Sequence, residues 1–200
     1  MTLDQKVRLV ETLFDQLELE TRQFQEKSKL SCVSGCGKCC TFPTIDASPL
    51  EFLPWAFQVF LSGKAEEVLE SLSSSTGQIC FLLSPVSMLS KGHCGSYRHR
   101  GLICRLFGYA AGKDKYGNLR LATCNIIKEE QTDCYEKTNK AIAEGLYVPV
   151  FTDYYMQLNQ IDYQLGSKIM PINKALKTAL EEVLQYYSYR PVPNMDRQIV

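Results

Sequence analysis

The sequence predicts a mainly α fold (α+β), with helices around a small irregular cysteine-rich core that includes a short β-hairpin. Apolar residues recur at helical spacing near both ends of the chain. From Cys80 to Cys124 this helical period is lost. The length suits one domain with a substantial core. The expected organisation is a single domain, 1–200, with the cysteine-rich core at 30–125 and helical flanks at 1–29 and 126–200.

The first element expected is one long helix over residues 2–28. Thr2 and Gln5 have the spacing of a capping box at its start. Apolar residues then follow in steps of three and four, and Thr21 is the one polar residue in this series. The repeat is short, which favours packing on the domain over a dimeric coiled coil. The expected buried stripe consists of Leu3, Val7, Val10, Phe14, Leu17 and Phe24.

A second helix is expected after the first cysteine-rich segment. Ser48, Pro49 and Glu51 supply an N-cap, a proline in the first turn and a capping-box acid. Pro54 is expected either to kink this helix or to reset its start. Gly63 is expected to end it.

The middle of the chain predicts a change from helix to strand. A short helix is expected over 65–72, followed by a serine-rich loop at 73–77. The run Cys80–Leu83 has the composition of a short buried strand. A β-hairpin is expected to pair 107–111 with 119–123 and to turn at 115–118.

Helical patterns return after Cys124. Asn125 is expected to cap a helix that runs to about Glu144. Thr152 is expected to cap another, which ends at Gly166. The final helix is expected to begin near Pro171.

The charge balance and the cysteine count exclude several classes of protein. The chain has 22 basic and 22 acidic residues, which argues against a nucleic-acid partner recognised through a basic surface. The N-terminus lacks a secretory signal, and the apolar runs are too short to cross a membrane. We therefore expect a cytoplasmic protein without a membrane partner. In that reducing compartment, nine cysteines, an odd number, are unsuited to a disulfide framework.

Four of the cysteines fall within residues 32–40. Their neighbours are glycine, lysine and serine, so this segment is poor core material and favours sharp turns. Converging thiolates are held together by a metal or by oxidation, and we interpret the segment as a metal site. Cys36 and Cys39 have the gap of a metal knuckle, and Cys32 completes the three-cysteine spacing used by radical SAM enzymes.

The adjacent pair Cys39 and Cys40 leaves the number of metal centres open. Neighbouring side chains of an extended segment point in opposite directions, so these two are expected to serve two metals, or one metal and the core. Two sets of four thiolates would satisfy two zinc ions or two clusters. The alternative is one four-ligand centre, with the other cysteines packed or redox-active. Cys134 is expected to pack on a helix face. The candidate ligands are Cys32, Cys36, Cys39, Cys40, Cys80, Cys94, Cys104 and Cys124.

Histidines and arginines accompany the third cysteine motif, which runs from Cys94 to Cys104. His93 and His99 are expected in supporting or surface roles, because eight cysteines suffice as ligands. Arg98, Arg100 and Arg105 flank Cys94 and Cys104. They are expected either to offset the negative charge of the thiolates or to form surface ion pairs.

The order of these motifs resembles the CxxCxxCC family, a zinc- or iron-chelating domain. The resemblance covers about residues 30–125 and implies that the cysteines chelate zinc or iron, without a settled reaction. A related group, the flagellin lysine N-methylases, carries a similar cluster with an iron–sulfur centre. This chain departs from the pattern in its first gap of three residues and in Arg100-Gly101, where Arg-Pro is usual. The matching motifs are Cys32-x3-Cys36-Gly-Lys-Cys39-Cys40, Cys80-Phe-Leu, Cys94-x2-Tyr97-x2-Arg100-x3-Cys104-Arg105-x-Phe107 and Cys124.

The favoured function is therefore metal binding, with zinc or iron, including a [4Fe-4S] cluster, as the partner. One alternative is an iron–sulfur-dependent modifying enzyme with SAM-type chemistry on Cys32, Cys36 and Cys39. Another is a thiol redox or metal-transfer protein. The sequence shows no succession of strand–helix units after Cys39 that would build a radical SAM barrel. Whether the protein is an enzyme, and any protein partner, stay open.

Overall fold

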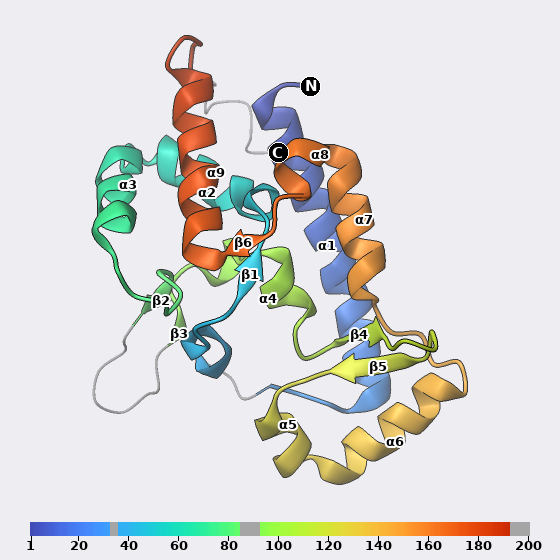
Figure 1. The fold of residues 1–200 in the computed structure, drawn as a ribbon. Helices are drawn as coiled ribbons and strands as arrows, with labels where there is room; N and C mark the ends of the chain where they lie inside the picture. The colour runs from blue at the N-terminus through green and yellow to red at the C-terminus, as the bar shows by residue number, and fades with distance from the viewer. Residues whose placement is uncertain (33–35, 85–92, 193–200) are drawn as a thin grey trace.

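The structure is a computed structural model that describes residues 1–32, 36–84 and 93–192. Over these residues the chain is mainly α with short antiparallel strand pairs, which confirms the expected fold class (Figure 1). No helix in these ranges is long and apolar enough to cross a membrane. The α-helices are α1 (Leu3–Ser28), α2 (Leu53–Leu61), α3 (Ala65–Ser74), α4 (Leu102–Leu106), α5 (Asn125–Glu130), α6 (Thr132–Ala143), α7 (Phe151–Ile161), α8 (Tyr163–Gly166) and α9 (Ile172–Tyr187).

Short strands and 3-10 turns connect the helices. Each strand pair has only two members, so the described residues form no extended sheet. The pairs are β1 (Asp46–Ala47) with β6 (Met170–Pro171), β2 (Leu83–Ser84) with β3 (His93–Cys94), and β4 (Ala110–Lys113) with β5 (Leu119–Ala122). The 3-10 turns are η1 (Lys38–Thr41), η2 (Pro49–Phe52) and η3 (Tyr97–His99).

The long helix α1 forms as predicted and contributes to two hydrophobic clusters. Thr2 and Gln5 make the expected capping box, and Lys29, at φ 58°, ends the helix. All six apolar residues of the expected stripe are buried. Leu3 to Leu17 pack into the main core, whereas Phe24 packs into a second cluster. One helix therefore links the two clusters.

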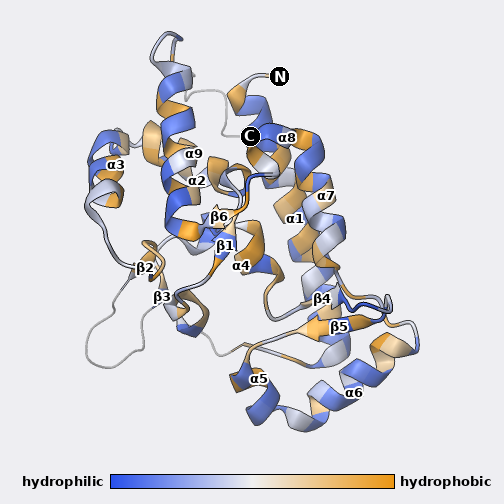
Figure 2. Ribbon diagram, in the orientation of Figure 1, coloured by the Kyte–Doolittle hydropathy of each residue, from blue (hydrophilic) through white to orange (hydrophobic). Residues whose placement is uncertain are grey.

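The main core lies where α1, α2, α7 and α9 meet. Phe52, Leu158 and Leu176 are among its fully buried side chains. The second cluster lies between the end of α1, the β4–β5 hairpin and α6, in the lower part of Figure 1. Figure 2 shows that α6 is largely hydrophilic and that α4, nearer the centre of the molecule, is mostly hydrophobic.

Glu51 joins three segments of the main core. The capping box of Ser48 and Glu51 forms as expected, but in the 3-10 turn η2, and Pro54 resets the helix so that α2 begins at Leu53. The Glu51 side chain is fully buried and accepts hydrogen bonds from the backbone amides of Ser48 (2.7 Å) and Ile103 (2.8 Å). It also accepts one from the Tyr155 hydroxyl (3.2 Å). Burial raises the pKa of this carboxyl to about 7, although these hydrogen bonds oppose the shift.

The predicted β-hairpin forms, but its first strand is Ala110–Lys113 rather than 107–111, because Phe107 ends helix α4; the second strand, Leu119–Ala122, lies where it was expected. The Asp114 carboxylate accepts hydrogen bonds from the amides of Tyr116 (2.8 Å) and Asn118 (2.9 Å) in the turn. Gly117 has φ 85°, a conformation that favours glycine.

Two predictions before the third motif were wrong in detail. Helix α3 continues through Ser74, into the expected loop. The expected strand Cys80–Leu83 is mostly a turn, and only Leu83 belongs to β2. Asn173 of α9 explains this turn, because its side chain accepts from the Phe81 amide (2.8 Å) and donates to the Ile79 carbonyl (2.9 Å). These tertiary contacts replace the partners that a strand would need.

The helices after residue 124 also differ from the prediction. Cys124, rather than Asn125, caps α5, and the expected long helix breaks at Gln131, where φ is −129°. The next helix, α7, begins at Phe151 without a cap from Thr152 and ends before Asp162, which caps the short helix α8. Helix α9 begins directly after Pro171, as expected.

Gly101 provides a test of the packing around Glu51. A Cβ atom added at residue 101 would lie 2.7 Å from Glu51 Oε2 and 2.7 Å from the Phe52 ring. Both neighbours are buried and have no room to move. We expect Gly101→Ala to lower the free energy of unfolding by about 1–3 kcal/mol, measured by chemical denaturation.

Gly112→Ala is the matched control for this substitution. A Cβ at residue 112 would meet no atom within 4 Å. We expect this variant to change the free energy of unfolding by less than about 1 kcal/mol. Equal effects of the two substitutions would contradict the packing described here.

Candidate metal centre

The eight cysteines proposed as ligands all line one cavity of about 1030 Å³. Cys134 does not line it; this residue lies partly buried in α6 and packs on the second cluster. One wall of the cavity is a face of α1 that includes Phe14 and Glu18. The structure therefore gathers segments far apart in the sequence around one space.

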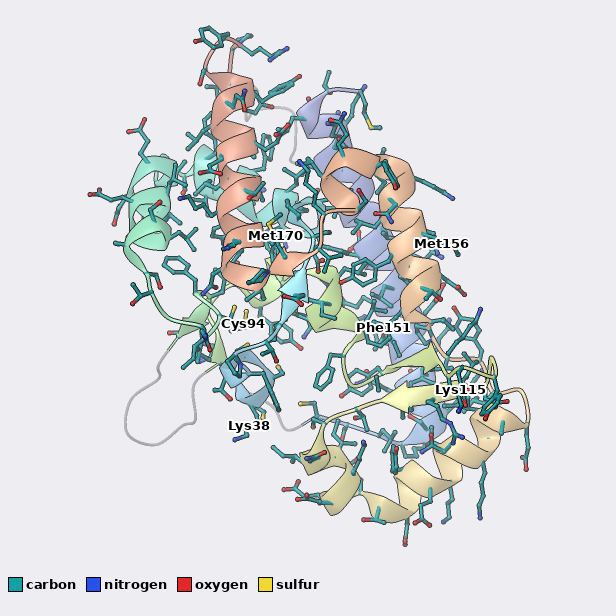
Figure 3. All side chains as sticks on the ribbon, in the orientation of Figure 1. Lys38, Cys94, Lys115, Phe151, Met156 and Met170 are labelled. Atoms are coloured by element: carbon teal, nitrogen blue, oxygen red, sulfur yellow. The ribbon has the colours of Figure 1, made fainter. Side chains whose placement is uncertain are left out.

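Four of the cysteines meet at the side of the cavity formed by the main core. The turn η1 carries Cys40, whose carbonyl accepts a hydrogen bond from the Cys80 amide (3.3 Å). Cys94 lies in β3, opposite Leu83 of β2, and β3 packs against η1. Figure 3 shows Cys94 on β3 and Lys38 on the neighbouring η1. Cys104 reaches the same space from α4.

Three cysteines lie at the side formed by the second cluster. The Cys32 amide donates to the Tyr109 hydroxyl (2.6 Å), and Tyr109 packs on that cluster. Cys124 also packs on it, and its Sγ accepts from the Ile127 amide (3.5 Å) at the start of α5. Cys36 follows along the chain and interacts with Cys32 through their thiols.

The structure corrects the expectation that Cys39 and Cys40 lie in an extended segment. Both are in the 3-10 turn η1, because the Cys40 amide donates to the Gly37 carbonyl (2.9 Å). The two thiols consequently lie close enough for each to affect the pKa of the other. Cys39 also lies near Cys32, Cys94 and Cys104, so it sits between the two sides of the cavity.

Crowding and burial raise the pKa values of several thiols. Burial, followed by the neighbouring thiolates of Cys36 and Cys124, raises the pKa of Cys32 to about 11. Burial, followed by the charges of Glu51 and Cys40, raises the pKa of Cys104 well above its usual range. Without a nearby cation these thiols are protonated at neutral pH. A metal ion that binds them must displace protons.

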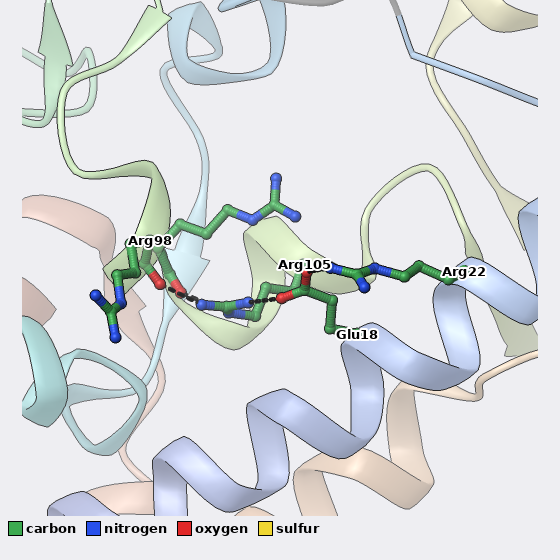
Figure 4. A network of polar contacts seen from close by, with 5 residues as sticks. Glu18, Arg22, Arg98 and Arg105 are labelled. Carbon is green, nitrogen blue, oxygen red and sulfur yellow. Dashed lines mark hydrogen bonds and ion pairs between the residues drawn. The ribbon is translucent and has the colours of Figure 1, made fainter. Parts of the chain in front are cut away.

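The three arginines expected near the cysteines have different environments. Arg105 donates to the carbonyls of Arg98 (2.5 Å) and Arg100 (3.1 Å) and pairs with Glu18 at 3.6 Å (Figure 4). Its role is therefore to hold the motif against α1. The Arg100 guanidinium lies 4.0 Å from the centre of the Tyr97 ring. Burial raises the pKa of Cys94, and the Ser96 amide and then the Arg100 charge oppose this shift. Arg100 is thus the arginine placed to offset thiolate charge.

Both histidines also line the cavity. His93 is exposed, whereas His99 is partly buried. Burial, followed by the charges of Arg98 and Arg105, lowers the pKa of His99. Its imidazole is therefore neutral near pH 7 and retains a nitrogen that can accept a hydrogen bond.

The donor set fits a soft metal centre, although its atoms are not gathered at coordination distance. Within 1–32, 36–84 and 93–192, no three cysteine, histidine or acidic side chains surround one point closely enough to hold a metal ion. Eight thiols around one cavity nevertheless provide the ligand type preferred by zinc and by iron–sulfur clusters. Binding would require the thiols to move closer together.

Residues 31–134 match the model of a protein family named CxxCxxCC, described as a putative zinc- or iron-chelating domain. The chain belongs to the CxxCxxCC family. The match covers just over half of the sequence and contains all nine cysteines. No curated protein and no solved structure matches the chain.

The structure explains one departure from the CxxCxxCC pattern. Where the family usually has proline, this chain has Gly101, and a Cβ atom at that position would lie against Glu51 and Phe52. Glu51 in turn accepts from the Ile103 amide, one residue before the Cys104 thiol. Glycine therefore permits the close approach that positions Cys104.

The sequence did not indicate the polar residues that hold the first cysteine of the motif. Gln131 accepts from the Ser31 amide (3.0 Å) and donates to the Ser31 carbonyl (2.7 Å). Tyr109 accepts from the next residue, Cys32. Because these partners lie in distant parts of the chain, no local spacing identifies them.

Gln131→Ala tests whether this pair of hydrogen bonds holds the cysteine segment. We expect the Ser31 amide to exchange its hydrogen faster, and the free energy of unfolding to fall by about 1 kcal/mol. Hydrogen exchange with mass spectrometry measures the first effect. Gln78→Ala, at an exposed loop position, is the control. An unchanged exchange rate at Ser31 would show that the pair does not restrain the segment.

Proposed function

We propose that this protein binds zinc or iron through Cys32, Cys36, Cys39, Cys40, Cys80, Cys94, Cys104 and Cys124. The observation that carries the proposal is the convergence of all eight on one cavity, while the ninth cysteine lies outside it. If these cysteines were only packing residues, there would be no reason for eight of the nine to line the same cavity. The family to which the chain belongs supports chelation in general, with zinc or iron as the metal.

The surroundings of the cavity suit a metal–thiolate centre. Four thiolates around a divalent zinc carry two excess negative charges, and guanidinium groups offset such charge. Burial raises the pKa of Cys94 and the Arg100 charge opposes that shift, while Arg98 and Arg105 also line the cavity. The role of the protein residues is to hold the thiols, balance their charge and limit access of water.

Two other functions receive less support. The strands of the described residues form two-stranded antiparallel pairs, with one isolated parallel bridge between Ala111 and Val150, and these do not build the parallel barrel of radical SAM enzymes. Thiol redox chemistry requires accessible thiolates, whereas burial and crowding raise the pKa values of Cys32 and Cys104. Metal binding is therefore the function best supported by the site.

The direct test is metal analysis of protein purified without oxygen and without a metal affinity column. We expect zinc in a colourless protein, or iron with inorganic sulfide in a brown one. A folded protein that contains neither metal, and takes up neither when loaded, would contradict the proposal.

Cysteine variants provide a matched comparison. We expect Cys39→Ser to reduce the metal content, because a serine hydroxyl is a poor substitute for a thiolate ligand. Cys134→Ser removes a cysteine of similar partial burial that lies outside the cavity, and we expect it to keep the full metal content. Equal metal loss in both variants would argue against a specific site.

A further inference from the structure

We infer that the eight cysteines form two metal centres, of which only one exchanges its metal readily with solution. The inference rests on the proposed function and adds to it how the ligands are grouped. The inner centre comprises Cys40, Cys80, Cys94 and Cys104. The outer centre comprises Cys32, Cys36, Cys39 and Cys124.

The inner group is part of the main hydrophobic core. Cys40 and Cys80 are 8% and 6% exposed and are joined by a backbone hydrogen bond. Cys94 and Cys104 pack against the same core. Cys80 and Cys94 affect the pKa of Cys40, and Cys40 affects the pKa of Cys104, as expected of thiols that share one region. Four thiols that belong to one packed region match the number required by a closed tetrahedral site.

The outer group is held by the second cluster and is nearer to solvent. Cys32 is exposed, and Cys36 and Cys124 are only partly buried. Their attachments are to Tyr109 and Ile127, which belong to the second cluster. After burial, Cys36 and Cys124 are also the thiols that raise the pKa of Cys32 most.

Cys39 completes the outer group, although it lies between the two. It is partly buried, packs against the main core, and has Cys40, Cys94 and Cys104 as well as Cys32 among its neighbours, so its packing alone does not assign it to one group. Its two-residue gap from Cys36 is that of a metal knuckle, in which one turn directs both sulfurs to the same ion. The inner group already has four thiols without it. The two centres are then neighbours that meet at the Cys39–Cys40 pair.

This grouping predicts different rates of metal loss. A chelator must reach the metal and replace its thiolates one at a time, and the exposed Cys32 offers such access. At the inner centre, Cys40 and Cys80 line the same cavity but are only 8% and 6% exposed and pack in the main core, so we expect a chelator to reach a metal there much more slowly. The outer centre is therefore suited to accept or release a metal, and the inner centre to stabilise the fold.

The test uses the full chain loaded anaerobically with zinc. Native mass spectrometry counts zinc before and after treatment with EDTA, and iodoacetamide followed by peptide mapping identifies the thiols released. We expect two zinc ions at first and one after EDTA. The thiols alkylated after EDTA should be Cys32, Cys36, Cys39 and Cys124, with the inner four protected until the protein is unfolded.

Variants separate the two centres. We expect Cys124→Ser to retain one zinc that resists EDTA, and Cys94→Ser to retain one zinc that EDTA removes. Cys94 is chosen because it is less buried than Cys80, and the labelling experiment on the unsubstituted protein stands if this variant does not fold. Cys134→Ser should behave as the unsubstituted protein.

Several results would overturn the inference while leaving the proposed function intact. These are a single bound zinc, two zinc ions that leave together or both resist EDTA, and alkylation that mixes the two groups. A chain that binds no zinc and no iron would instead overturn the proposed function itself.

Discussion

The packing of α1 against both hydrophobic clusters is the constraint on which the rest of the structure depends. The apolar face of its first four turns packs in the main core, and Phe24, near its end, packs in the second cluster. The cysteine cavity lies alongside the same helix, with Phe14 and Glu18 in its wall. Glu18 also pairs with Arg105, which fixes the third cysteine motif against α1. The position of one helix thus determines how the cysteine-bearing segments approach one another.

The thiols in this cavity are crowded in a way that favours a cation. Thiolates held close together repel, and burial further disfavours their charge, which is why the pKa values of Cys32 and Cys104 are raised. A bound metal reverses both effects by supplying positive charge. The buried Glu51 carboxylate accepts a hydrogen bond from the Ile103 amide of α4 and so helps to position Cys104. The charge of Glu51 also raises the pKa of the Cys104 thiol. Under the proposed function, metal binding and folding of the core would therefore be coupled.

The sequence predicted those parts of the structure that depend on local patterns. The periodicity of α1, its capping box and the hairpin turn at Asp114 depend on residues close in the chain, and these predictions were confirmed. The break at Gln131 was missed because its cause is a pair of hydrogen bonds to Ser31. Spacing identified the four cysteines of 32–40, and the family resemblance together with the loss of helical period added the other four; all eight line one cavity. The sequence could not show which hydrophobic cluster each cysteine-bearing segment packs against, because that depends on contacts between distant parts of the chain.

X-ray absorption at the metal edge, on protein purified anaerobically, tests the central claim most directly because it reports the atoms bound to the metal. Coordination by the cysteines predicts a first shell of sulfur alone, at about 2.3 Å for zinc. For an iron–sulfur cluster the same sulfur shell is accompanied by a second iron neighbour. A first shell of oxygen or nitrogen would contradict the account, because it would place the metal outside the cysteine cavity.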